Sequence, residues 1–88
     1  MQGKSMAAQV APNLHALGAA VRETRARRKM SQEVLGFAAS LHRNYVGAIE
    51  RGEINPTLRT LMQLAHGLEV PLSELVVLYE RNVGQQLP

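Results

Sequence analysis

Residues 30–52 read MSQEVLGFAASLHRNYVGAIERG and predict two short helices joined by a tight turn. Ser31 is a good N-cap for the first helix, expected over about 32–39, where apolar residues recur at helical spacing. A polar break begins at Ser40, and a second helix follows over about 43–51 until Gly52, a residue typical of a helix C-terminus. A helix that turns Arg43, Asn44, Tyr45 and Gly47 outward and is braced by another helix fits the major groove of duplex DNA.

The flanking sequence predicts three further helices. Asn13 is a plausible cap for a helix that ends near Arg28, and Thr57 caps another that follows the helix-excluding Pro56. Pro71 suits the first turn of a last helix. We therefore expect an all-α fold, with five helices around one small core. The expected boundaries are a flexible leader over 1–12, a domain over 13–80 and a frayed tail over 81–88.

Composition limits the type of protein. A chain of 88 residues has room for one domain, and its 45% hydrophobic content includes only three aromatic residues and no cysteine, which suits packed aliphatic helices. It contains neither an apolar stretch typical of a signal peptide nor a membrane-spanning run, so we expect a soluble cytoplasmic protein. Residues 1–59 carry nine Lys or Arg against four Glu, whereas residues 60–88 carry one Arg against three Glu. This asymmetry puts positive potential on the half that holds the helix pair, as attraction to phosphates requires.

The helix pair and its flanks resemble the helix-turn-helix of the phage-repressor, Cro and Xre group of DNA-binding regulators. The resemblance runs from about Leu17 to about Leu75 and rests on an ordered set of matches: Leu17-Gly18, Arg22, Arg25, Ser31-Gln32, Leu35, Arg43-Asn44-Tyr45, Ile49-Glu50-Arg51-Gly52, Asn55-Pro56-Thr57-Leu58, Leu61, Leu64-Ala65 and Leu68-Glu69-Val70-Pro71. It implies a compact five-helix bundle of the lambda-repressor-like type. It also implies a sequence-specific transcriptional regulator that acts as a homodimer on a near-palindromic operator in double-stranded DNA.

The same resemblance assigns roles to individual residues. Base contacts are expected from Arg43, Asn44, Gly47 and Ala48, and phosphate contacts from Gln32, Tyr45, Arg51, Asn55, Arg59 and Thr60. The chemistry is suitable, because arginine can bond guanine and asparagine can bond adenine through two hydrogen bonds each. Gln32 also stands at a helix start, where free N–H groups favour an anion.

Three further expectations concern how the helices meet. The resemblance pairs Arg25 of the first helix with Glu50 behind the reading helix. Gly36 is expected where the two short helices approach closely, because glycine inside a helix otherwise costs about 1 kcal/mol relative to alanine. Ser40 occupies a turn position where the family usually has glycine, so either a positive φ strains it by about 1 kcal/mol or the turn geometry differs slightly.

The last helix has more apolar residues than packing against one layer requires. Helical spacing sends Leu72, Leu75, Val76 and Tyr79 towards one side and leaves Val77 and Leu78 partly on another. Such a surplus in a small domain marks a partner surface, so the predicted dimer interface consists of Leu75, Val76, Val77, Leu78 and Tyr79. The alternative is that the second side packs on the first helix or on the N-terminal residues.

Nothing in the sequence indicates an enzyme. His15, His42 and His66 lack the spacing of a zinc site, and we find no phosphate-binding glycine loop, nucleophile motif or catalytic carboxylate pair. No cofactor or metal is therefore expected. Two alternatives remain open for a chain of this type: an antitoxin whose main partner is a toxin protein, and a co-activator-type interaction module that does not read bases.

Overall fold

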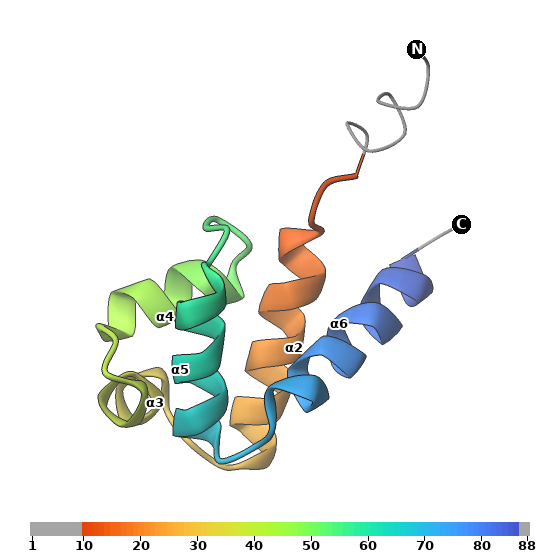
Figure 1. The fold of residues 1–88 in the computed structure, drawn as a ribbon. Coiled ribbons are helices and arrows are strands. Elements are labelled where there is room, and N and C mark those ends of the chain that lie inside the picture. Colours follow the sequence, from red (N-terminus) through yellow and green to blue (C-terminus); the bar gives the residue numbers. More distant parts are fainter. Residues whose placement is uncertain (1–9, 87–88) are drawn as a thin grey trace.

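The protein, seen in a computed structural model that describes residues 10–86, has five helices in that range and no strand. In chain order they are α2 (Leu14–Arg27), α3 (Gln32–Ala39), α4 (Arg43–Glu50), α5 (Leu58–Leu68) and α6 (Leu72–Gln86). Helix α2 runs through the middle, with α6 along one side and the shorter helices α4 and α5 on the other (Figure 1). The predicted all-α, five-helix fold is confirmed. Residues 1–9 of the expected leader lie outside the described residues.

Side-chain caps begin three of these helices where the sequence predicts them. Asn13 Oδ1 accepts a hydrogen bond from the Ala16 amide at 2.9 Å, Ser31 Oγ from Val34 at 3.0 Å, and Thr57 Oγ1 from Thr60 at 3.1 Å. Each cap supplies a partner to an N–H group that the helix itself leaves unpaired.

The turn between α3 and α4 is left-handed. Ser40 has φ 60° and ψ 42°, the conformation that glycine adopts at lower cost, and its amide closes the last turn of α3. The Leu41 amide then donates to the Gly36 carbonyl at 2.7 Å. A Cβ added at Gly36 would lie 2.5 Å from the Leu41 carbonyl oxygen, so only glycine allows this turn to fold back so tightly.

The core lies where the five helices converge. Its largest fully buried apolar side chains come from all five helices: Val21, Leu35, Val46, Ile49, Leu64, Leu68 and Leu75. Gly18 brings α2 against the end of α4, because a Cβ there would lie 2.6 Å from the Ile49 carbonyl oxygen. The core therefore fixes α4 against both α2 and α3 and leaves its N-terminal end exposed.

Helix α6 extends further than the sequence pattern predicts. It continues to Gln86, whereas a frayed tail was expected from residue 81. Polar contacts with α2 hold this part in place: Arg81 Nη2 donates to Glu23 Oε1 at 2.6 Å, and Asn82 Nδ2 donates to the Ala16 carbonyl at 3.1 Å. An apolar periodicity does not register such contacts, which is why the predicted end was too early.

Candidate nucleic-acid interface

The first two residues of α4 lie at its accessible end. Arg43 and Asn44 are both exposed, at the end of the helix where the dipole is positive. Arg43 Nη1 lies 3.6 Å from Glu33 Oε1 of α3, an exposed ion pair that holds the guanidinium only weakly. Both side chains can therefore reach out from a helix whose back is fixed in the core.

The rest of the expected reading face differs from the prediction. Gly47 is buried under two side chains, because a Cβ there would lie 3.3 Å from Gln32 Oε1 and 3.0 Å from Arg51 Nη1. Tyr45 is half-buried against the core, and Ala48 is half-buried too. With α2 and α3 both packed on this eight-residue helix, its buried stripe is wider than the amphipathic pattern indicates. The accessible side chains concentrate at Arg43 and Asn44.

A buried carboxylate ties α2, α3 and α4 together behind that face. Glu50 is only 2% exposed, and its two oxygens accept from Arg25 Nε at 2.6 Å, Arg25 Nη2 at 3.0 Å and Gln32 Nε2 at 2.9 Å. Arg22 Nη2 donates to the Glu50 backbone carbonyl at 2.9 Å. The hydrogen bond to Glu50 raises the pKa of Arg25, so this guanidinium stays charged. The network fixes the angle between the bracing helices and α4.

Gln32 has two neighbours that the sequence did not predict. It is the first residue of α3, where free N–H groups favour an anion, but its side chain is half-buried between Glu50 and Gly47. One N–H of the amide is used by Glu50, which leaves the second for another acceptor.

The loop between α4 and α5 carries the remaining candidate phosphate contacts. Asn55 and Arg59 are exposed, and Arg51 is exposed but bonded to Glu53, with Nε–Oε2 2.8 Å and Nη2–Oε1 3.2 Å. Thr60 differs from the expectation, because it is 8% exposed and its Oγ1 lies 3.1 Å from Thr57 Oγ1. Its hydroxyl supports the start of α5 instead of pointing outward.

The cap of α4 is a feature that the sequence reading missed. His42 precedes the helix, and its Nδ1 accepts a hydrogen bond from the Asn44 amide at 3.0 Å. Histidine is not among the residues usually preferred at an N-cap, so only the position immediately before Arg43 could have suggested this role.

Comparison with known proteins also identifies a helix-turn-helix in this chain. The family model described as helix-turn-helix matches residues 21–75. The chain is 43% identical over 56 residues to control protein C.SmaI of Serratia marcescens, a match that covers 64% of this chain and 67% of that protein. It is 37% identical over 60 residues to the immunity repressor protein of Bacillus phage phi105, covering 68% of this chain and 42% of that one. The protein belongs to the Xre/Cro-type helix-turn-helix family of DNA-binding transcription regulators.

Solved structures of restriction–modification controllers share the regulator's fold. The controller protein C.AhdI from Aeromonas hydrophila superposes with a TM-score of 0.69 at 40% identity, over 70% of this chain and 94% of that one. Wild-type controller C.Esp1396I gives a TM-score of 0.76 at 26% identity, over 84% of this chain and 97% of that one. The likeness to these controllers therefore extends over most of the domain.

The regulator's last helix presents a smaller apolar surface than predicted. Leu75 and Leu78 are 1% and 8% exposed, so they belong to the interior, whereas Val76 and Val77 are 44% and 61% exposed. Leu78 thus faces inward, whereas the sequence pattern placed it with Val77 partly on another side. The reason is that α6 packs along the length of α2. Tyr79 is half-buried, and its hydroxyl accepts a hydrogen bond from the Asn13 amide at 3.1 Å.

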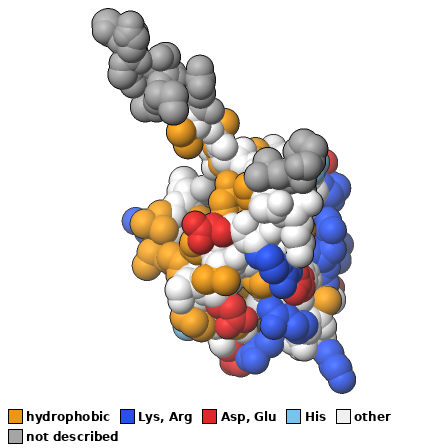
Figure 2. Space-filling model, turned by 90° about the vertical axis from the view of Figure 1, so that its right-hand side faces the viewer, with side chains coloured by type: hydrophobic (Ala, Val, Ile, Leu, Met, Phe, Trp, Pro, Cys, Tyr) orange, Lys and Arg blue, Asp and Glu red, His pale blue; other side chains and the backbone are white. Residues whose placement is uncertain are grey.

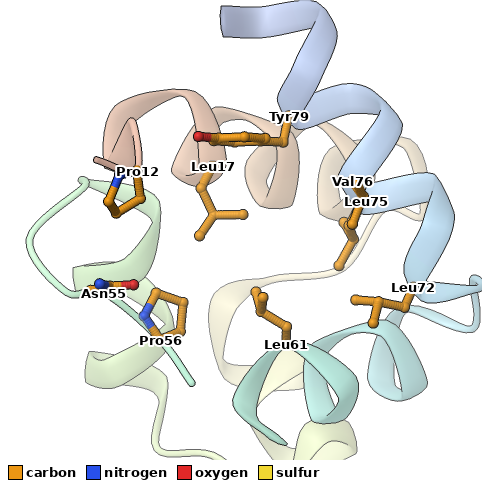
Figure 3. Close-up of a pocket in the computed structure, with 9 residues that line it drawn as sticks. All are labelled: Pro12, Leu17, Asn55, Pro56, Leu61, Leu72, Leu75, Val76 and Tyr79. Atoms are coloured by element: carbon orange, nitrogen blue, oxygen red, sulfur yellow. The ribbon is translucent and has the colours of Figure 1, made fainter. Parts of the chain in front are cut away.

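An apolar pocket of about 300 Å³ opens beside this surface. Figure 3 shows Leu17 of α2 and Leu61 of α5 pointing into it from opposite sides, with Tyr79 and Val76 of α6 nearby. In the view of Figure 2 most of the visible Lys and Arg side chains lie along one edge, and the larger hydrophobic side chains lie towards the opposite edge. On the face seen in Figure 2, the basic side chains and the larger hydrophobic side chains therefore lie mostly apart.

Residues 10–86 contain neither a cluster of metal ligands nor a single membrane-spanning helix. No group of three or more His, Cys, Asp or Glu side chains in that range could hold a metal ion. No single helix there is long and apolar enough to cross a membrane. Only α5 and residues 72–85 taken together reach that length and composition, and these two segments meet at an angle of 106°.

Proposed function

We propose that the protein binds a near-palindromic operator as a homodimer and regulates transcription from it, as a controller of the restriction–modification type. The observation that carries this proposal is the exposure of Arg43 and Asn44 at the N-terminus of a helix fixed from behind by α2 and α3. A rigid helix with exposed Arg and Asn side chains at its tip suits direct readout in the major groove.

Base reading in this proposal is the task of Arg43 and Asn44, and the small side chain of Ala48 allows close approach. Phosphate contacts surround them on the helix starts and the following loop, from Gln32, Tyr45, Arg51, Asn55 and Arg59. Such contacts position the protein on the duplex without carrying base identity. A cluster of this size supports both specific and non-specific binding.

A dimer is proposed because one copy of α4 can contact too few base pairs. A single recognition helix contacts only a few base pairs, so useful specificity takes two copies related by a twofold axis. The exposed Val76 and Val77 beside the apolar pocket supply a surface suited to such a contact, together with the half-buried Tyr79. Identities of 43% and 40% to controllers C.SmaI and C.AhdI favour the controller subtype.

Selection from a random DNA pool with the purified protein tests the proposal. We expect enrichment of an inverted repeat whose half-sites lie one helical turn apart, about 10 base pairs, or a multiple of it. The complex at saturation should contain two chains per repeat by sedimentation. Enrichment of no sequence, or of a single half-site bound by one chain, would contradict it.

A second candidate function rests on the outer face of α3. Phe37 is 90% exposed and Val34 53% exposed, and neither α4 nor the α6 surface uses them. An apolar surface of this kind would suit an antitoxin or a co-activator-type module that binds another protein. A salt titration on unrelated DNA and on the selected duplex distinguishes the classes, because an interaction module shows no specific excess. A toxin gene next to the gene for this chain would favour the antitoxin.

A further inference from the structure

His42 gives the recognition helix a cap unlike those of α2, α3 and α5. The caps Asn13, Ser31 and Thr57 use side-chain oxygens that stay acceptors throughout the physiological pH range. At α4 the acceptor is an imidazole nitrogen, with Nδ1 at 3.0 Å from the Asn44 amide. The backbone at His42, φ −68° and ψ 142°, is extended as a capping residue requires.

This acceptor exists in one protonation state only. Nδ1 has a free lone pair when the ring is neutral and its proton is on Nε2, whereas both nitrogens are donors in the imidazolium ion. Imidazole gains its second proton within about pH 5 to 8. Protonation therefore removes the hydrogen bond to Asn44 and also places a positive charge at the positive end of the helix dipole.

The surrounding charges do not cancel that effect. The acidic residue of α3 is Glu33, which is exposed and paired with Arg43, the first residue of α4. On α2, Arg22 and Arg25 meet α4 at Glu50, the opposite end of the helix. His42 itself is exposed, and the Glu33 carboxylate is paired with Arg43 and not with the His42 ring.

The length of α4 makes its cap important. A helix of eight residues has few internal hydrogen bonds to offset the cost of starting it, so the first turn depends strongly on its cap. That turn carries Arg43 and Asn44, and the amides of Tyr45 and Val46 both donate to the His42 carbonyl. Ordering of the first turn and orientation of the two exposed side chains are thus coupled.

We propose that His42 is a positioning residue for DNA binding: its neutral imidazole orders the first turn of the recognition helix, and acidification releases that turn and weakens operator binding. The proposal uses the DNA binding of the family and does not require the dimer. Two variants separate the cap from the rest of the side chain. His42→Asn keeps an acceptor that does not titrate, and His42→Ala removes the acceptor.

Amide hydrogen exchange of residues 44–46 in the free protein, corrected for intrinsic rates, gives the first test. Loss of an ordinary cap corresponds to about a fivefold loss of protection. We expect the wild type to lose that factor between pH 8 and pH 5.5, His42→Asn to keep its protection at both, and His42→Ala to be about fivefold less protected at both. The same pH profile in the wild type and in His42→Asn overturns the proposal.

Two further measurements test its separate parts. Long-range ¹H–¹⁵N spectra at pH 8 should show His42 as the Nε2–H tautomer, and a Nδ1–H tautomer overturns the capping role. Affinity for a duplex enriched from a random pool, at pH 8 and constant ionic strength, should be about fivefold weaker for His42→Ala than for His42→Asn. Equal affinity of these two variants overturns the link between the cap and DNA binding.

Discussion

The guanidinium of Arg25 and the carboxylate of Glu50 form a two-point hydrogen-bonded pair across α2 and α4, with Nε–Oε2 2.6 Å and Nη2–Oε1 3.0 Å. The Glu50 side chain is 1% exposed and that of Arg25 is 17% exposed, so little water reaches the pair. Its geometry aligns α4 with the helices that brace it. A buried pair of this kind contributes orientation more reliably than net stability.

A double-mutant cycle on this pair should be strongly non-additive. Arg25→Met or Glu50→Leu alone leaves an uncompensated charge beside the core and should cost about 3–5 kcal/mol, whereas the double variant should cost less than either. Urea unfolding measures the three free energies. The exposed Arg81–Glu23 pair is the matched control, where a cycle should give about 0–1 kcal/mol. Additive losses of unfolding free energy at Arg25 and Glu50 would show that the two residues are not coupled.

Substitutions in the helix pair should separate base reading from phosphate binding. Arg43→Ala and Asn44→Ala should each weaken binding to the selected duplex by about 1–3 kcal/mol. Binding to unrelated DNA should be largely unchanged. Gln32→Ala should weaken both kinds of binding alike, because phosphates carry no base identity. Titrations at fixed salt give these values, and unfolding of Gln32→Ala controls for its lost bond to Glu50. If Arg43→Ala lowers both kinds of binding equally, the base-reading assignment is wrong.

Removing the acidic partner of Arg51 should strengthen DNA binding. The hydrogen bond from Arg51 lowers the pKa of Glu53, so the carboxylate stays ionised and keeps its arginine down to a pH below the usual glutamate range. Glu53→Gln deletes that charge and should tighten binding to any duplex at low salt, with the gain shrinking as salt screens it. Glu80→Gln, the same charge change on α6, is the control. A gain that is independent of salt would contradict a role of Arg51 at phosphates.

Charges placed on the exposed part of α6 should dissociate the proposed dimer without unfolding the chain. Val76→Glu combined with Val77→Glu should sediment as a folded monomer at micromolar concentration and bind the inverted repeat much more weakly than a wild-type dimer. Val34→Glu on α3 should leave sedimentation unchanged. Leu78→Glu should unfold the protein, because this side chain is only 8% exposed. A wild-type monomer that binds the repeat at full strength excludes α6 from the mechanism.

Two helical glycines should respond to alanine in opposite ways. Gly18→Ala would place a Cβ against the Glu50 and Ile49 carbonyl oxygens and should cost about 1–3 kcal/mol of unfolding free energy. Gly84 has nothing within 4 Å of an added Cβ, so Gly84→Ala should stabilise α6 by about 0.5–1 kcal/mol. Thermal or urea unfolding compares them. Equal effects would show that the approach of α2 to α4 is not tight.

The sequence by itself determined the helices and most of their limits. Local chemistry sets the helix limits. Ser31 and Thr57 cap the helices that follow them because their hydroxyls reach the third amide of each helix, and Pro56 excludes helix before it. The turn at Ser40 and the close approach at Gly36 were also readable, because each depends on backbone sterics within a few residues. The family resemblance added the placement of Arg43 and Asn44 on the reading helix.

Only the tertiary structure decided which faces are covered and which polar groups meet. Gly47 is buried because the side chains of Gln32 and Arg51 cover it, Leu78 is buried because α6 follows α2, and α6 continues to Gln86 because Arg81 and Asn82 bond to α2. The cap at His42 depends on a ring orientation that no residue preference encodes. Contacts between residues distant in sequence depend on the path of the whole chain, whereas a cap or a turn depends on a few neighbouring residues. That difference in range is why the helices could be predicted and the exposed surfaces could not.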